Sequence, residues 1–300
     1  MTAVWHGVIA LTSVAMLAHS EPSLVVDSAT ELRGDPVTIR VVGAEPGAPI
    51  TLTAERIYGR RDPSLRRAAA TFEADAHGVV DVATMAPTAG SYRSVDRSGL
   101  FWSMRPTDTE LPDWGTSTVI HISVDLDADG AADLRDTVTL RPSIDGLERI
   151  PIGDEHPAAF LMRPPSVERP PVVIVMGGSE GHDSTARSIA PKLASRGFAV
   201  VGLPYYSPAW GSQPQRIPGL PRAFHNIDLS RVESIRDWIR AQDDLDGERI
   251  GLWGVSKGGE MALAAASRID GFSSVVAIVP SDVIWEGWGS GTTEGESSCF

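Results

Sequence analysis

The sequence predicts a mixed architecture, in which a small β-sandwich precedes an α/β domain with a doubly wound, mostly parallel sheet. Three observations support this prediction. Residues 24–140 consist of short segments of alternating polarity separated by turn residues, which is typical of a sandwich. From residue 144 onward, apolar runs of strand length alternate with helical segments, which is typical of parallel βα units. A Gly-x-Ser-x-Gly motif joins one of these runs to a helix.

Composition limits the classes of function. The 300 residues are 42% hydrophobic and 22% charged, as expected for a globular chain with a core. The net charge of −13 argues against nucleic acid or an anionic membrane as partner, because both bind clustered cations. The single cysteine, Cys299, excludes an internal disulfide and a thiolate metal cluster. We therefore expect a small-molecule substrate, and the oligomeric state stays open.

Residues 1–20 resemble an export signal. Val8 to Ala18 is an apolar run of signal-peptide length, and Ala18-His19-Ser20 resembles a small-x-small cleavage site. The usual cationic residues before the run are missing, so an N-terminal strand or helix is the alternative. We predict cleavage after Ser20 and a periplasmic or secreted protein; without cleavage it would be cytoplasmic. No later apolar run is long enough to span a bilayer.

The first folded domain is predicted to span residues 21–142 as an immunoglobulin-like β-sandwich. Its segments alternate in polarity with a period of two, and glycine, proline and aspartate occupy the turns between them. No long 3.6-residue periodicity appears, which argues against a helical domain here. The expected strands are residues 37–42, 50–54, 69–74, 79–83, 119–124 and 137–140.

One turn of this domain carries an acidic pattern. Carboxylates fall at positions 1, 3, 5, 9 and 12 of a loop with glycine at position 6, which is the spacing of a calcium-binding loop. The five residues are Asp125, Asp127, Asp129, Asp133 and Asp136. Position 12 is Asp instead of the longer Glu, and the flanks resemble strands instead of helices. An acidic hairpin tip is therefore the favoured interpretation, and a calcium site is the alternative.

Residues 143–300 are predicted to form the α/β domain. Short extended pieces at residues 148–152 and 158–162 precede Pro171 to Met176, an unbroken apolar run typical of a strand buried on both faces. This strand–helix alternation predicts a parallel sheet covered by helices. Further strands are expected at residues 198–203, 250–255 and 275–279, and helices at residues 184–196, 229–240 and directly after residue 256.

The Gly-x-Ser-x-Gly motif, Gly254 to Gly258, predicts a nucleophile elbow centred on Ser256. In such an elbow, a sharp strand-to-helix turn exposes the serine hydroxyl, and the flanking glycines leave room for the strained backbone. The N–H of the next residue, Lys257, lies at a helix N-terminus, where it can stabilise a developing oxyanion. A structural Gly-Ser turn is the alternative interpretation.

The glycine-rich turn after the first parallel strand reads GGSEGH, residues 177–182. In an α/β-hydrolase this loop supplies the second oxyanion N–H, which assigns Gly178 and the neighbouring Ser179 to the predicted catalytic set. Glycine allows the backbone to approach a substrate closely. The lysine and hydroxyl of a phosphate-binding P-loop are absent, so no cofactor is expected. An ordinary strand-to-helix turn is the alternative.

Several segments resemble those of acyl-CoA thioesterases and bile acid-CoA:amino acid N-acyltransferases, which form one family. The matching segments are GVSKGGEMALAAAS, VIVMGGSEGH, LASRGFAVVGLPYY, ERIGLWGVSKG and, upstream, GLFWSM after an AP and GSY pattern. The resemblance covers nearly everything after residue 21. It implies a β-sandwich before an α/β-hydrolase domain, and hydrolysis of an acyl-CoA thioester through an acyl-enzyme on Ser256. The acyltransferase branch uses cysteine as nucleophile, so serine favours the hydrolase branch.

The order of residues departs from that of a complete α/β-hydrolase, in which the acid and the histidine follow the nucleophile. All seven histidines precede Ser256, and the sequence stops at Phe300. We therefore expect a truncated member or fragment that lacks the last strands of its sheet, the triad acid and the triad histidine, with weak or no activity. His182, in the glycine-rich loop, is the nearest candidate for a substitute base.

Three functions remain open from the sequence. The first is an acyl-CoA thioester hydrolase. The second is an exported carboxylesterase similar to dienelactone hydrolase, which the leader favours because CoA esters are chiefly intracellular. The third is a non-catalytic binding module. No basic cluster suited to CoA phosphates is evident, and Arg216 and Arg222 are the nearest candidates. The aromatic segment 204–210 is expected either to line an acyl pocket or to pack in the core.

Overall fold

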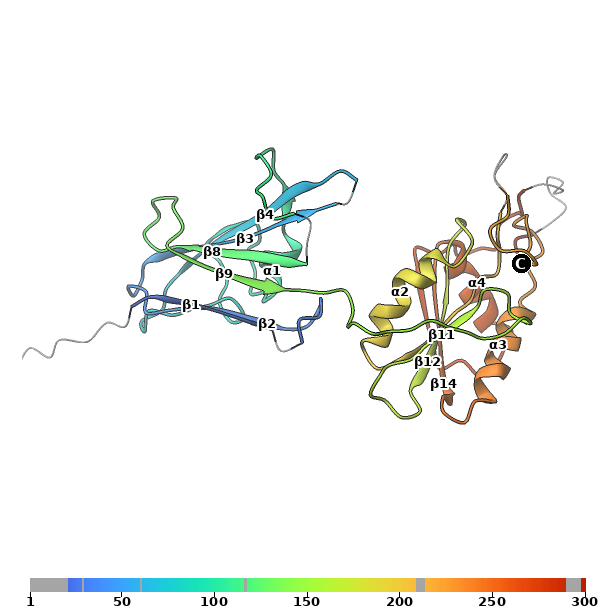
Figure 1. Ribbon diagram of the computed structural model, residues 1–300. Helices are drawn as coiled ribbons and strands as arrows, with labels where there is room; N and C mark the ends of the chain where they lie inside the picture. Colours follow the sequence, from blue (N-terminus) through green and yellow to red (C-terminus); the bar gives the residue numbers. More distant parts are fainter. Residues whose placement is uncertain (1–20, 29, 60, 116–117, 209–213, 290–297) are drawn as a thin grey trace, which may run out of the picture. The chain divides into compact units, whose positions relative to one another are not determined.

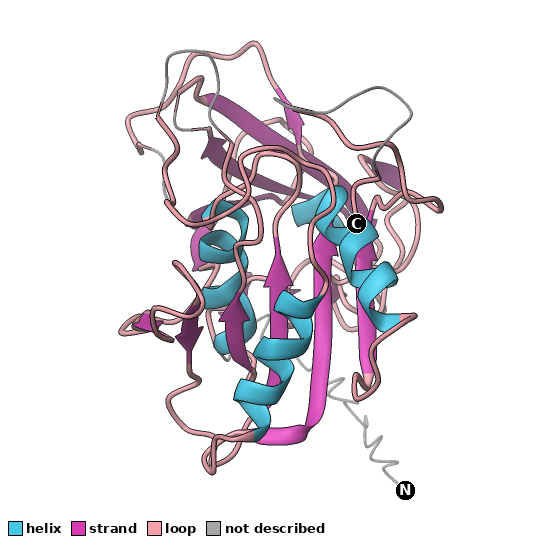
Figure 2. Ribbon diagram, turned by 90° about the vertical axis from the view of Figure 1, so that its right-hand side faces the viewer, coloured by secondary structure: helices cyan, strands magenta, loops and turns pink. Residues whose placement is uncertain are grey.

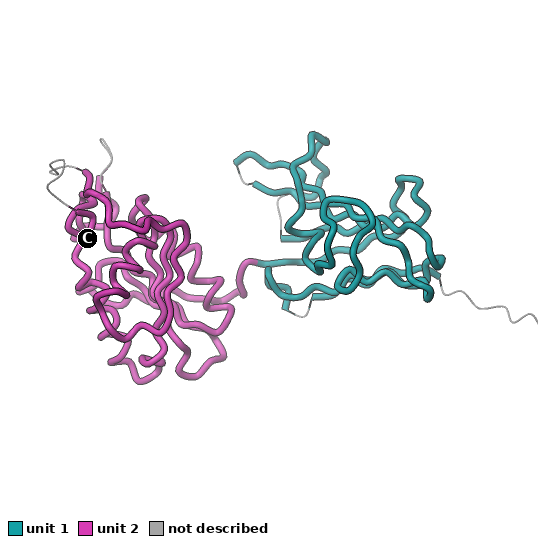
Figure 3. Tube along the Cα trace, turned by 180° about the vertical axis from the view of Figure 1, so that it is seen from behind, with its two compact units in different colours: residues 1–141 teal, residues 142–300 magenta. Residues whose placement is uncertain are grey.

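The chain divides into two compact units, residues 1–141 and 142–300, which Figure 3 colours separately. The computed structural model describes residues 21–28, 30–59, 61–115, 118–208, 214–289 and 298–300. The predicted export signal, residues 1–20, lies outside these described residues. Within them, no helix has the length and apolar character needed to cross a membrane.

Unit 1 is a β-sandwich in which two antiparallel sheets share one core (Figure 1). The strand orders are β1-β2-β5 and β6-β4-β3-β8-β9, with β7 paired to β4. Ile39 and Val41 from the first sheet meet Leu52 and Phe72 from the second in this core. The strands are β1 (Ser23–Ser28), β2 (Val37–Val42), β3 (Pro49–Tyr58), β4 (Ser64–Glu73), β5 (Val80–Asp81), β6 (Ala89–Gly90), β7 (Arg105–Pro106), β8 (Val119–Asp125) and β9 (Leu134–Thr139).

Unit 1 differs from the sequence-based expectation in several elements. The pattern did not predict β1, the two-residue strands β6 and β7 or the short helix α1 (Gly99–Trp102), and β9 begins at Leu134 instead of the expected residue 137. Strands β3 and β4 extend well beyond the predicted residues 50–54 and 69–74, because arginines interrupt the apolar alternation while the backbone pairing continues through them. The immunoglobulin-like arrangement stays a prediction.

Unit 2 holds a mostly parallel sheet in the order β10-β11-β13-β12-β14-β15, in which β12 to β15 run parallel and β10 and β11 antiparallel. This is the predicted doubly wound architecture. The strands are β10 (Ile150–Pro151), β11 (Phe160–Met162), β12 (Pro171–Met176), β13 (Ala199–Gly202), β14 (Asp246–Val255) and β15 (Ser274–Ile278). The helices are α2 (Ser184–Ala194), α3 (Ser230–Arg240) and α4 (Lys257–Ala266).

The helices of unit 2 pack on opposite faces of this sheet (Figure 2). Ala186 and Ala190 of α2 pack against Val175 and Val200 in one cluster. In the other cluster, α3 and α4 cover the alternate side chains, Ile174 and Ile250 among them. The parallel strands therefore read as unbroken apolar runs, because both of their faces are covered.

The strand β15 differs from its neighbours in the sheet. It lies at the end of the strand order, and its apolar side chains remain accessible, with Val276 48% exposed. An exposed apolar edge strand is an arrangement that proteins usually protect from pairing with other chains. The same strand supports the candidate site, because its Ile278 carbonyl accepts the N–H of Ser256 at 2.9 Å.

Candidate active site

Ser256 occupies the sharp turn between β14 and α4. Its φ of 52° and ψ of −119° lie outside the regions that side chains ordinarily allow, and the residue is exposed. Such strain persists only where the surroundings enforce it, and it is characteristic of functional sites. The backbone of Ser256 is held on both sides, by the Ile278 carbonyl and by the N–H of Glu260, which donates to the Ser256 carbonyl at 3.0 Å.

The two outer glycines of the motif are required by close backbone contacts. A Cβ atom on Gly254 would lie 2.0 Å from the Gly258 carbonyl oxygen. One on Gly258 would lie 2.2 Å from the carbonyl oxygen of Gly177, in the glycine-rich loop. Both distances are far inside van der Waals contact. The elbow therefore closes on itself and against that loop only because neither position has a side chain.

The glycine-rich loop lies directly beside the nucleophile. A Cβ atom on Gly178 would lie 3.3 Å from the Cβ of Ser256 and 2.8 Å from Oε2 of Glu180. The structure records no acceptor among the described residues for the N–H of Gly178 or of Lys257. The two predicted oxyanion donors thus flank Ser256. Ser179, the third predicted loop residue, is exposed, and no contact with Ser256 is recorded for it within the described residues.

Tyr205 anchors the glycine-rich loop from the core. Its hydroxyl donates to the Gly177 carbonyl at 2.8 Å, and burial raises the pKa of this phenol well above its usual value, which keeps the donor protonated. Tyr205 and Tyr206 both make edge contacts with Phe224 inside the core. These two aromatic residues therefore pack instead of lining an acyl pocket. Residues 209–213 lie outside the described residues.

The side chain of Lys257 turns inward, toward the buried carboxylate of Glu260. Its Nζ lies 2.7 Å from Oε2 of Glu260 and 3.3 Å from Sγ of Cys299. The other carboxylate oxygen of Glu260 accepts the N–H of Trp285 at 3.1 Å. Burial raises the pKa of the Cys299 thiol although the ammonium opposes this change, so the thiol stays neutral. Sequence reasoning missed Glu260, although its i,i+3 spacing from Lys257 was a signal.

His182, the predicted substitute base, bonds to another residue in this structure. Its Nδ1 lies 3.0 Å from Oγ of Ser207, which is fully buried and also accepts the N–H of Ile217 at 3.1 Å. Burial, reinforced by the cationic Arg216, lowers the pKa of His182, so the ring is neutral at neutral pH. Within the described contacts, its ring pairs with Ser207 and not with Ser256.

Glu180 is an ionisable group of this loop that sequence reasoning missed. Its carboxylate oxygens lie over Gly177 and Gly178, and it accepts a hydrogen bond from the hydroxyl of Thr185. The loop therefore brings a carboxylate, in addition to backbone N–H groups, next to the nucleophile. Its position within GGSEG gave no separate signal, because the side chain's direction depends on the turn that the glycines make.

The acidic pattern of unit 1 forms the tip of the hairpin between β8 and β9. Ligand atoms of Asp125, Asp127 and Asp133 lie within 4.8 Å of one another, whereas Asp129 and Asp136 lie outside this group. The carboxylates accept backbone N–H groups of the turn, as in the bonds from Ala128 to Asp125 and from Leu126 to Asp133. These bonds account for the acidic residues as turn formers, and the calcium site stays a prediction.

Comparison with known proteins matches the two halves of the chain separately. Residues 34–149 match the family model of the acyl-CoA thioester hydrolase/BAAT N-terminal region, and residues 158–286 match the dienelactone hydrolase family. The first match confirms the resemblance noted in the sequence. The second, together with the sheet order, confirms the predicted α/β-hydrolase class of unit 2.

Two rat acyl-coenzyme A thioesterases and one solved structure illustrate what the chain is similar to. Rat acyl-coenzyme A thioesterase 1 is 33% identical over 257 residues, 81% of this chain and 57% of the relative. Rat acyl-coenzyme A thioesterase 2, mitochondrial, is 33% identical over 81% of this chain and 52% of the relative. The structure of a putative dienelactone hydrolase from Klebsiella pneumoniae shares 18% identity at a TM-score of 0.37, over 47% of this chain and 61% of that chain. The chain thus spans about half the length of the curated relatives it matches.

Proposed function

Because this chain is related to acyl-CoA thioesterases along both of its units, we propose that it hydrolyses acyl-CoA thioesters with Ser256 as nucleophile. The observation that carries the proposal is the geometry of the elbow. Ser256 is exposed in a strained turn, with the backbone N–H groups of Lys257 and Gly178 beside it. This combination of strain and preorganised donors suits an attacking hydroxyl and serves no evident structural purpose.

The proposed reaction has two steps. The Ser256 oxygen attacks the thioester carbonyl, the C–S bond breaks, and the CoA thiol leaves with a proton. Water then cleaves the acyl-enzyme, which releases a carboxylate and restores the serine. The N–H groups of Lys257 and Gly178 stabilise the oxyanion in both steps, and one such donor is typically worth roughly 10²–10³ in kcat.

The proton of Ser256 needs an acceptor for the first step. His182 is held by Ser207, and Glu180 places a carboxylate in the loop beside Ser256. We propose that hydrolysis by these 300 residues is slow, because Nδ1 of the predicted base is bonded to Ser207 and no contact of its ring with Ser256 is recorded among the described residues.

A second candidate is an exported carboxylesterase of the dienelactone-hydrolase type. The match of residues 158–286 to that family favours it, and so does the predicted leader. Thioester and oxygen-ester hydrolysis would pass through the same acyl-enzyme. The two candidate functions are therefore distinguished by which substrate acylates the protein faster. We expect octanoyl-CoA to acylate the protein faster than p-nitrophenyl octanoate does; the reverse order would favour the second candidate.

The direct test is covalent labelling of the nucleophile. We expect a fluorophosphonate probe to add to Ser256, with the modified peptide identified by mass spectrometry, and Ser256→Ala to abolish the adduct. A folded protein that resists labelling, or labelling at another residue, would sink the proposal. Export is tested separately, by sequencing the N-terminus of the protein recovered outside the cytoplasm, where Glu21 is the expected first residue.

A further inference from the structure

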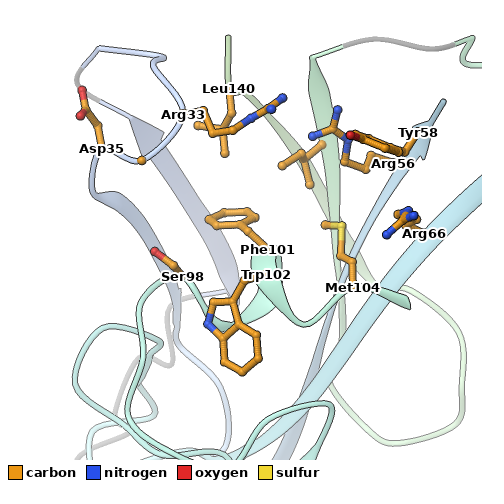
Figure 4. A pocket seen from close by; sticks show the side chains of 12 residues that line it. Arg33, Asp35, Arg56, Tyr58, Arg66, Ser98, Phe101, Trp102, Met104 and Leu140 are labelled. Atoms are coloured by element: carbon orange, nitrogen blue, oxygen red, sulfur yellow. The ribbon is translucent and has the colours of Figure 1, made fainter. Parts of the chain in front are cut away.

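A groove of about 940 Å³, here called the outer groove, lies on the face of the larger unit 1 sheet that is turned away from the sandwich core. Leu52 and Ala54 of β3 point into the core, so the alternate residues Thr53 and Glu55 point outward and line the groove. The cavity that Figure 4 shows lies on the inner side of the same sheet, where the core residue Met104 contributes to its wall. The outer groove is thus built from the solvent-facing residues of these strands.

Two loops bound the outer groove. Trp114, in the loop before β8, stacks on the ring of His121 near the start of that strand, with 3.7 Å between the ring centroids and 18° between the planes. At the other end of the strand, Gly130 to Ala132 of the β8–β9 hairpin tip line the groove. The indole is held by the stack and is still 38% exposed. The sheet face therefore carries a bounded recess with a fixed aromatic wall.

The floor of the outer groove carries short hydroxyl side chains. Thr53 on β3 pairs with Ser123 on β8, and Thr137 on β9 lies opposite His121. Among the described residues, no hydrogen bond is recorded for the hydroxyls of Thr53, Ser123 and Thr137. A hydroxyl both donates and accepts, so this floor suits a ligand whose own groups do both.

The charged side chains of the outer groove are nearly balanced. Nε of Arg67 donates to Oε1 of Glu55 at 2.6 Å, which compensates both charges. Arg135, opposite Ser123, lines the groove, and no hydrogen bond or ion pair is recorded for it within the described part of the chain. Burial lowers the pKa of His121, so its ring is neutral at neutral pH. The aspartates of the hairpin tip stand close by and disfavour an anionic ligand.

These features restrict the class of ligand. An alkyl chain would cover the floor hydroxyls and the Arg135 guanidinium without giving them partners, which is costly. A nucleotide would suit the aromatic wall, but its phosphates would meet the acidic hairpin tip. A sugar has hydroxyl groups that donate and accept, and an apolar C–H face that packs on an aromatic ring. The volume is near the upper end of the range for small-molecule sites, which favours more than one sugar ring.

We propose that the outer groove binds a neutral oligosaccharide. The C–H face of one sugar ring lies on the indole of Trp114. Its hydroxyl groups pair with Thr53, Ser123 and Thr137, and the guanidinium of Arg135 donates to a further hydroxyl. This inference does not depend on the proposed activity of Ser256, because the residues that line the groove all belong to unit 1.

A glycan array of neutral and anionic oligosaccharides, probed with the full chain, tests the proposal. We expect binding to neutral glycans, and calorimetry then measures the affinity for the tightest of them. Trp114→Ala and Arg135→Gln should each weaken that binding about tenfold, through loss of an aromatic contact and of a charged donor. Trp102→Ala and Arg93→Gln are the matched controls, because both are exposed residues of unit 1 outside the groove, and they should leave the affinity unchanged.

Several outcomes would overturn the inference. One is the absence of binding to every glycan on the array, and another is binding that both groove variants retain. Tighter binding of anionic glycans, or of AMP in the calorimeter, would assign the groove a different ligand. Circular dichroism checks that each variant folds, and Arg135→Gln carries the test alone if Trp114→Ala does not. Ser256→Ala should bind the glycan as the parent does, so the failure of the proposed hydrolysis would leave this result unaffected.

Discussion

Two cationic side chains reach the interior of this molecule under opposite conditions. Lys257 in unit 2 is 13% exposed and meets the carboxylate of Glu260, itself 3% exposed, at 2.7 Å. Arg66 in unit 1 faces another cation, Arg56, across a strand pair. The first charge is compensated within the fold, and for the second the structure records a contact with the ring of Tyr58 and, among the described residues, no ion pair.

The difference indicates distinct roles for the two cations. A buried charge with a partner of opposite sign has much of its desolvation cost offset by that partner, and removing one partner is strongly destabilising because it leaves the other charge buried and unpaired. A buried charge that faces a like charge destabilises its neighbourhood and is retained only where something else requires it. Lys257 therefore belongs to the framework under the elbow, whereas Arg66 lies where the hairpin register places another arginine opposite it.

Removing the partner of Lys257 should have the largest effect. Glu260→Ala leaves the ammonium without its carboxylate and the N–H of Trp285 without its acceptor, so we expect a loss of about 3 kcal/mol in the free energy of unfolding. Urea denaturation measures it. The matched control is Glu233→Ala on α3, which breaks an i,i+3 pair with Arg236 in which Glu233 is half-exposed, and which should change stability by under about 1 kcal/mol. Equal losses in the two variants would contradict the framework role.

The second-largest effect should come from substituting a glycine of the elbow. In Gly258→Ala the new methyl group would overlap the Gly177 carbonyl, so the loop must move away from Ser256. We expect the rate of fluorophosphonate labelling to fall about 100-fold, the typical effect of losing one oxyanion donor. Gly259→Ala is the control, because its nearest contacts, at 3.3 Å, require shifts of only a few tenths of an ångström. Similar labelling rates for the two variants would show that the close approach is unnecessary.

Relieving the like-charge pair should produce a smaller effect of opposite sign. Arg66→Met keeps the apolar stem and removes the charge, so we expect the free energy of unfolding to rise by about 0.5 kcal/mol at low ionic strength. The gain should shrink in 1 M salt, because screening already weakens the repulsion in the parent. Arg67→Met, which loses the ion pair with Glu55, should show no gain. A destabilised Arg66→Met would mean that the guanidinium has a compensating partner.

The Ser256 elbow and the Arg56–Arg66 pair show which features of the structure can be predicted from the sequence and which cannot. Ser256 and its glycines are adjacent in the chain, so one short motif between a strand and a helix predicts their geometry. Arg56 and Arg66 meet only through the register of a hairpin, and the charges themselves shortened the predicted strands to residues 50–54 and 69–74. The bond between His182 and Ser207 likewise joins loops that follow different strands. Local backbone geometry is thus readable from the sequence, whereas pairings between distant segments depend on the register and turns of the folded chain.

His182 is a third case, because its partly buried ring stays neutral. Substituting it should produce the smallest effect, a change in the pH dependence of stability. Its pKa in the folded state lies below the unfolded value of about 6.5, so the unfolded state binds more protons as the pH falls through that region. This group therefore contributes a loss of stability as the pH falls through the unfolded pKa of about 6.5 toward the lower folded pKa, and no pH dependence well above 6.5. His182→Asn, whose side chain tolerates the φ of 65° and can bond Ser207, should reduce the difference between the urea midpoints at pH 8 and pH 5.5. His121 and His156, whose pKa values burial also lowers, supply the pH dependence that remains in both proteins. An unchanged difference would mean that the bond to Ser207 holds the protonated ring as well as the neutral one, and His182 would then join Lys257 as a compensated cation.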